Sequence, residues 1–346
     1  MPAELANPSS AAPGTPPWLW PHVLSLEAPA VAMLWLAALA RINDFRLMPG
    51  VLPGLGLAVW LIYLADRVLD TIGVPPQQLS ARHLFYRRFR WPLVLAVIPA
   101  VAATVAWLAL WVVPVGLLAH SLAQVLPIGL YLVLYSITGR RTRRWLIQAG
   151  VLVLLFLLNT LPLPATVMVP VSLLIAGATI LVFRLNWDEQ VGRFFRKEVA
   201  AGLLFAFGCT TWTRFHALGS EGPDIWAELV LLGLLFVSNL TVITAREEAP
   251  AGAPGSGPGS VRGAIALCVG ALAAIQFAYL PATLVPLTWA VLAGLVGLEI
   301  LWQKRRHLSP EAFRVWADVI VAIPAAVLLL MPEASSSATD AAACCL

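Results

Sequence analysis

Apolar stretches about as long as a bilayer is thick recur along this chain, with short polar segments between them. The sequence is 60% hydrophobic and only 12% charged, with a mean hydropathy of +0.84, whereas soluble domains carry about 25% charged residues. About 20 apolar residues cross a bilayer as one helix, which satisfies its own backbone hydrogen bonds. The chain is therefore predicted to be all-α, a polytopic membrane helix bundle, and its net charge of +4 gives no indication of nucleic-acid binding.

The predicted number of transmembrane helices is nine to eleven, because several prolines could either separate two helices or kink one. The prolines concerned are Pro114, Pro162, Pro164 and Pro281. The candidate spans lie near residues 27–43, 51–66, 92–112, 114–137, 145–162, 166–185, 199–217, 225–245, 263–281, 283–302 and 313–331.

Basic residues indicate how these spans are oriented, because Lys and Arg concentrate in short cytoplasmic loops. With eleven spans and a cytoplasmic N-terminus, all of the 22 basic residues fall on the cytoplasmic side except Arg41, Arg46 and Arg214. The sequence thus predicts a multi-pass integral membrane protein, of the bacterial inner membrane, with its carboxylate site on the cytoplasmic face.

Low-complexity segments delimit the predicted membrane domain. Residues 1–25 are Ala-, Pro- and Ser-rich and are expected to form a disordered N-terminal segment, and residues 333–346 a disordered tail. Residues 26–332 form the transmembrane helical domain. Within it, the Gly- and Pro-rich residues 249–260 predict a flexible cytoplasmic linker.

Two carboxylates at the end of the second span mark the candidate site. Asp66 and Asp70 lie one helical turn apart and share a face, and ionisable groups in a membrane span usually mark function. Mg²⁺ is commonly bound by one or two carboxylates together with substrate phosphates. The alternative is a structural cluster, in which the carboxylates pair with Arg67 or with arginines of the next loop.

The segment Tyr63-Leu-Ala-Asp-Arg-Val-Leu-Asp70 resembles the UbiA superfamily of intramembrane prenyltransferases. Members carry an Asn-Asp-x-x-Asp-x-x-x-Asp motif at the cytoplasmic end of the second helix, where its carboxylates bind isoprenyl diphosphate through Mg²⁺. On that frame Ile62 and Tyr63 take the first two places, and Asp66 and Asp70 take the last two. The resemblance therefore implies that Asp66 and Asp70 are catalytic metal ligands.

A second acidic motif of the family has two candidate equivalents here. Asn239 and Glu247 occupy its first and last places at the end of the eighth span, and the resemblance implies that they complete the metal site. The alternative roles are an interhelical hydrogen bond for Asn239 and a solvated loop charge for Glu247. A competing alignment places the second metal site at Asn186 and Asp188.

Basic side chains in two loops are the expected ligands of the diphosphate. Arg193 to Gly208 resembles the loop and Gly-rich helix that follow the family's fourth helix, with two extra helices inserted near 145–185. Arg82 and Arg87 follow the second span, and an arginine fork matches phosphate oxygens. The implied diphosphate ligands are Arg82, Arg87, Arg193 and Lys197. The alternative is ordinary cytoplasmic loop charge.

The resemblance implies a Mg²⁺-dependent intramembrane enzyme that ionises an isoprenyl diphosphate and transfers the prenyl group to an apolar or aromatic acceptor. A UbiA-type terpene cyclase, which needs no acceptor, is the first alternative. A non-catalytic transporter or scaffold is the second, although transporters tend to place ionisable groups at mid-membrane rather than at one interface.

Overall fold

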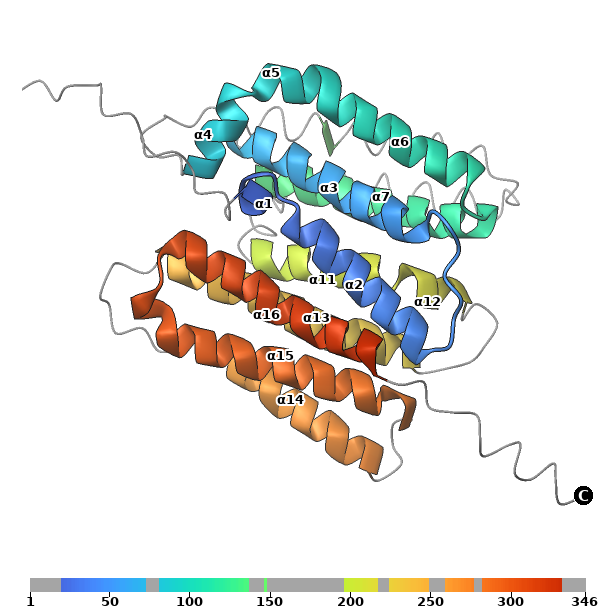
Figure 1. The fold of residues 1–346 in the computed structure, drawn as a ribbon, viewed down its shortest axis with the longest axis vertical. Helices are drawn as coiled ribbons and strands as arrows, with labels where there is room; N and C mark the ends of the chain where they lie inside the picture. The colour runs from blue at the N-terminus through green and yellow to red at the C-terminus, as the bar shows by residue number, and fades with distance from the viewer. Residues whose placement is uncertain are drawn as a thin grey trace, which may run out of the picture.

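The computed structural model describes residues 20–72, 81–136, 146–147, 196–216, 224–248, 259–276 and 282–331, and these described residues are helical with no strand (Figure 1). The predicted spans near 145–162 and 166–185 lie outside the described residues, apart from two helical residues at 146–147, and so does most of the predicted linker. Asn186, Asp188 and Arg193 lie outside them as well.

The first half of the bundle follows the predicted spans closely. Its helices are α1 (Trp20–Val23), α2 (Glu27–Ile42), α3 (Val51–Asp70), α4 (Ala81–Arg88), α5 (Arg90–Pro92), the π-helical turn η3 (Leu93–Val97), α6 (Ile98–Trp111) and α7 (Val115–Ser136). Of the N-terminal segment predicted as disordered, residues 20–25 are described. Here the Ser25 hydroxyl lies 3.1 Å from the Tyr86 hydroxyl, and the Trp20 ring packs edge-on against Phe85. These contacts fix the segment before α2 against α4.

The second half contains one break that the hydropathy pattern does not predict. Its helices are α11 (Lys197–Cys209), α12 (Thr211–His216), α13 (Asp224–Glu248), α14 (Gly259–Gln276), η4 (Ala282–Leu284), α15 (Val285–Lys304), η5 (Arg305–His307) and α16 (Pro310–Leu330). The apolar stretch 199–217 is divided at Thr210, whose hydroxyl donates to the Ala206 carbonyl. Arg214 donates to the Phe207 carbonyl at 2.6 Å and stacks over the Phe207 ring. The break is stable because these side chains satisfy the carbonyls that it frees.

Five of the described helical segments are long and apolar enough to cross a membrane: Val51–Asp70, Arg90–Trp111, Trp226–Glu247, Val285–His307 and Pro310–Leu330. This confirms, for the part of the chain that the structure describes, an all-helical fold that contains helices of membrane-spanning length. The count of nine to eleven spans and the UbiA-like arrangement stay predictions.

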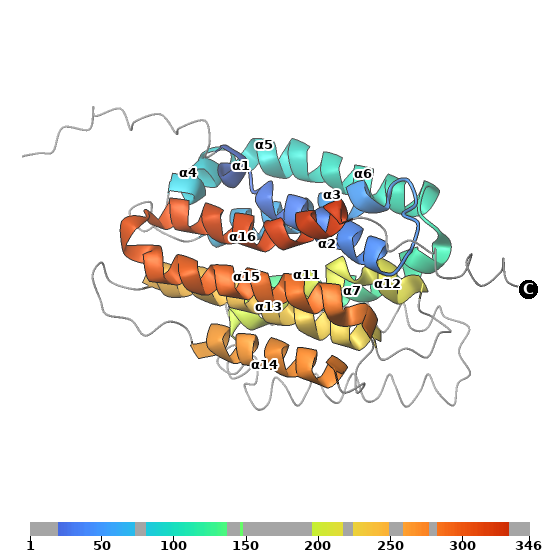
Figure 2. The same cartoon turned by 60° about the horizontal axis from the view of Figure 1, so that its bottom comes forward.

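Helices from distant parts of the sequence form the core. α2 packs against α3 and α16, α15 lies between α14 and α16, and α11 runs along α13 (Figures 1 and 2). In the centre, the fully buried Trp35 donates its indole N–H to the Val321 carbonyl at 3.0 Å. Gly202 allows close approach of α11 and α13, because a Cβ atom there would lie 2.6 Å from the backbone nitrogen of Val237.

The antiparallel course of the helices brings charged residues together at one end of the bundle. The C-terminal ends of α3 and α13 meet the N-terminal ends of α11 and α16 there, and ion pairs link α11 to α3 and α16 to α13. We call this the charged end. Arg41, Arg46 and Arg214 lie at the opposite end, so the described basic residues separate between the two ends as predicted.

Candidate functional site

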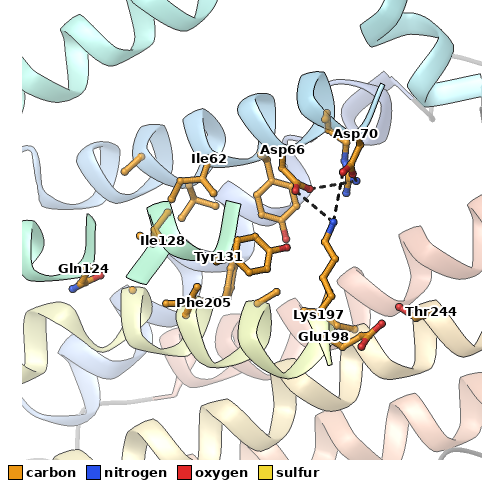
Figure 3. Close-up of a pocket in the computed structure, with 18 of the residues that line it drawn as sticks. Ile62, Asp66, Asp70, Gln124, Ile128, Tyr131, Lys197, Glu198, Phe205 and Thr244 are labelled. Carbon is orange, nitrogen blue, oxygen red and sulfur yellow. Dashed lines mark hydrogen bonds and ion pairs between the residues drawn. The ribbon is translucent and has the colours of Figure 1, made fainter. Parts of the chain in front are cut away.

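A cavity of about 340 Å³ opens among α3, α7, α11, α13 and α16 at the charged end (Figure 3). We call it the charged cavity. Its ionisable lining residues are Asp66, Arg67, Asp70, His83, Lys197, Glu198, Glu247 and Arg314. Small-molecule sites in proteins typically occupy about 300–1,000 Å³ and contain a few convergent polar groups. The charged cavity has both the size and the composition of a ligand site.

Asp66 and Asp70 face the cavity from the last turns of α3, and two cations bridge them. Lys197 Nζ lies 3.5 Å from Asp66 Oδ1 and 3.7 Å from Asp70 Oδ1. Arg67 Nη1 lies 3.6 Å from Asp66 Oδ2 and 3.4 Å from Asp70 Oδ2. Like charges one helical turn apart repel each other, and the bridging cations offset that repulsion. The predicted pair is therefore assembled, and the lysine that contacts it comes from a segment far away in sequence (Figure 3).

The two residues predicted from the second acidic motif make separate interactions, and one of them lines the cavity. Glu247 Oε1 forms an ion pair with Arg314 Nη1 at 3.1 Å, and both residues line the cavity. Asn239 is buried deeper in α13, where its Nδ2 donates to Asp318 Oδ1 at 3.1 Å. This is an interhelical hydrogen bond of the kind considered for it. Within the part of the chain that the structure describes, no three His, Cys, Asp or Glu residues form a group suited to a metal ion.

The side chains that the structure describes in the short helix α4 differ in their relation to the cavity. His83 lines the cavity, whereas Arg87 is exposed and lies outside the lining. Arg82 occupies the first turn of α4. Of the two predicted diphosphate ligands whose side chains the structure describes, Arg87 and Lys197, Lys197 lines the cavity.

Several polar residues of the lining were not predicted as site residues from the sequence, among them Tyr131, Tyr63 and Gln124. Tyr131 projects from α7 with its hydroxyl directed toward Asp66 (Figure 3), and Tyr63 lies under the Arg67 guanidinium, 5.9 Å from the ring centre. Gln124 lies deeper on α7, where its Nε2 donates to Thr211 Oγ1 at 2.6 Å. Tyr63 and Asp66 are three residues apart on α3, a spacing that could have indicated a shared face.

A second, apolar cavity of about 370 Å³ continues from the first toward the opposite end of the bundle. Its lining comes from α3, α6, α7 and α12 and is almost entirely apolar. Both cavities share the residues Leu55, Ala58, Ile62, Gln124, Ile128 and Gly208. We call it the apolar cavity. Together the two spaces match an amphiphile, with a charged headgroup at one end and an apolar chain at the other.

The lining of the charged cavity fits a divalent cation that arrives with an anion. Asp66 and Asp70 offer the oxygen ligands that Mg²⁺ takes, and the ammonium of Lys197 already occupies a cation position between them. The lining carboxylates Asp66, Asp70, Glu198 and Glu247 outnumber the fixed cations Arg67, Lys197 and Arg314. A bound polyanion therefore requires additional positive charge, which a divalent cation would supply.

In comparisons with known proteins, no family model matches the chain, and neither the curated proteins nor the solved structures give a significant match.

Proposed function

We propose that the protein binds an isoprenyl diphosphate across the two cavities and ionises it. The observation that carries this proposal is the continuity between the charged cavity and the apolar cavity through six shared residues. A diphosphate needs cationic partners and a long isoprenyl chain needs a dry apolar space. The two requirements are met at opposite ends of one connected space.

The reaction breaks the allylic C–O bond, and the electron pair leaves with the diphosphate oxygen. Arg67, Arg314 and Lys197 surround the position in which negative charge develops, so they stabilise the leaving group electrostatically. Mg²⁺, held by Asp66 and Asp70, would supply further positive charge to the diphosphate. The protein's own contribution is thus a fixed set of charges at one end of the substrate.

The carbon cation is left at the boundary between the two cavities, where Tyr131 and Phe205 present aromatic rings. Ring faces stabilise cations, and the apolar lining beyond them excludes water that would quench the cation prematurely. The cation then forms a C–C bond with an apolar or aromatic acceptor, giving prenyl transfer, or with a double bond of its own chain, giving terpene cyclisation. In both cases the new cation loses a proton, which the released diphosphate accepts, to give a neutral product.

The test is turnover of labelled geranyl, farnesyl and geranylgeranyl diphosphates by the purified protein in lipid nanodiscs. We expect Mg²⁺-dependent release of diphosphate, lowered by about 100-fold or more in Asp66→Asn and in Asp70→Asn, because each removes a charged oxygen ligand of the cation that would stabilise the leaving group. A cyclic hydrocarbon formed without an acceptor selects cyclisation, and release only with an acceptor selects transfer.

The matched control is Glu299→Gln, which also removes one carboxylate from a helix. The Glu299 side chain pairs with Arg262 and lies outside the cavity lining. It should release diphosphate at the wild-type rate. Equal rates in the Asp66 and Asp70 variants and in the wild type would rule out the proposed site. Binding without turnover, independent of Mg²⁺ and unchanged in both variants, would instead support a transporter or scaffold.

A further inference from the structure

The ammonium of Lys197 lies between Asp66 and Asp70, at the position that a cation bound by both carboxylates would occupy. Its distances of 3.5 and 3.7 Å to one oxygen of each carboxylate are nearly equal, and both exceed the roughly 2.7–2.9 Å of a direct charge-assisted hydrogen bond. The ammonium thus bridges Asp66 and Asp70 rather than binding either one closely. Figure 3 shows its side chain extending from α11 across the cavity to reach them.

Of the two cations that bridge Asp66 and Asp70, Lys197 is also the less firmly held. Its side chain is 38% exposed, whereas that of Arg67, on the other side of the same carboxylates, is 13% exposed. Arg67 is further held by Tyr63 and by its place within α3. Lys197 is the first residue of α11 and carries its charge on a flexible four-carbon stem.

We propose, on the basis of the proposed function, that Lys197 is a place-holding cation. Its ammonium neutralises Asp66 and Asp70 while the headgroup is absent, and it transfers to the headgroup anion when a divalent cation takes the position between them. The ammonium and a divalent cation repel each other at such short range, so they cannot share the position. Because the released ammonium needs an anionic partner, the metal and the anion each strengthen the binding of the other.

The first experiment measures the binding of Mn²⁺ alone, by its electron paramagnetic resonance signal, to the full-length protein in detergent. Mn²⁺ prefers oxygen ligands of the same kind as Mg²⁺. We expect Lys197→Gln to bind Mn²⁺ about tenfold more tightly than the wild type, because the competing ammonium is gone. Lys304→Gln, at the charged end but outside the cavity lining, should bind like the wild type, and adding Asp66→Asn to Lys197→Gln should abolish the gain.

The second experiment needs no variant, because Lys197 and Lys304 are the only two lysines in the chain. Acylation by an amine-reactive ester is followed by mass spectrometry at both residues. Saturating Mn²⁺ should speed labelling of Lys197 several-fold, since it displaces the ammonium, and inorganic pyrophosphate added afterwards should slow it again. Lys304 should react at one rate throughout.

The outcomes separate this inference from the proposed function. Unchanged Mn²⁺ affinity in a folded Lys197→Gln variant, or unchanged labelling of Lys197 at saturating Mn²⁺, would overturn the place-holding role even if isoprenyl diphosphates are turned over. If Mn²⁺ binding and the labelling of Lys197 respond as expected but no isoprenyl diphosphate is turned over, the place-holding role is upheld and the enzymatic reaction is refuted.

Discussion

The close approach of α11 and α13 at Gly202 gives a quantitative test of the fold around the site. An alanine Cβ atom at this position would lie 2.6 Å from Val237 N and 2.8 Å from Val237 Cα. Both are backbone atoms, so rotation of a side chain cannot relieve the contact. The two helices would have to separate by about 0.8 Å to reach an ordinary contact distance.

Gly202→Ala should therefore destabilise the protein. Overpacking of this kind costs about 1–3 kcal/mol, and the better helix propensity of alanine offsets about 0.5–1 kcal/mol of it. We expect a net loss of about 1–2 kcal/mol in the free energy of unfolding. Lys197 precedes Gly202 by five residues, about 7.5 Å along the same helix, so its ammonium should also shift relative to α3.

The assay is reversible unfolding in mixed micelles, followed by tryptophan fluorescence. Gly233→Ala is the matched control in the same interface, because its Cβ atom would meet the flexible end of Leu203 at 3.1 Å. Gly270→Ala, in α14, would meet nothing within 4 Å. If Gly202→Ala unfolds at the same denaturant concentration as Gly270→Ala, the close backbone contact does not exist and the packing described here is wrong.

Three other substitutions test single interactions, the first two by the same unfolding measurement and the third by amide hydrogen exchange. Trp35→Phe removes the donor to the Val321 carbonyl and leaves a small void, so it should cost about 1–3 kcal/mol; a neutral effect would contradict that contact. Arg262→Ala breaks an ion pair whose arginine side chain is 67% exposed, and a loss above about 1 kcal/mol would be unexpected for such a pair. Tyr86→Phe removes the hydroxyl that contacts Ser25, so amide hydrogen exchange in α4 should become faster than in the wild type; unchanged exchange would show that this contact does not hold α4.

Hydropathy predicted the described helices well because the bilayer leaves the backbone few alternatives. The stretch from 92 to 112 illustrates this, since it corresponds to one continuous helical segment, Arg90–Trp111. The break at Thr210 was not predicted from the apolar pattern. It depends on the hydroxyl of Thr210 and the guanidinium of Arg214, whose hydrogen bonds to carbonyls are local polar interactions that hydropathy does not describe.

The site was predictable where its residues share one helix face or lie in a segment with a family resemblance. Asp66 and Asp70 were identified by their spacing, and Lys197 by the resemblance of Arg193 to Gly208 to the loop after the family's fourth helix. Tyr131 and Arg314 were not predicted as site residues, because only the packing of α7 against α3 and of α16 against α13 brings them to the cavity. A single sequence shows the periodicity of polar and apolar residues along each helix, but it does not show which other helices pack against that helix.

The break between α11 and α12 at Thr210 separates the placement of Lys197 from the shape of the apolar cavity. One continuous helix would have coupled these two properties. The charged cavity receives Lys197 from the start of α11, whereas Thr211 and Trp212 of α12 line the apolar cavity. Under the proposed function, substitutions in the short helix α12 would alter how deep the isoprenyl chain reaches, while the ionic groups that meet its headgroup would stay in place. The preference for a given isoprenyl chain length and the chemistry at the diphosphate could therefore change independently during evolution.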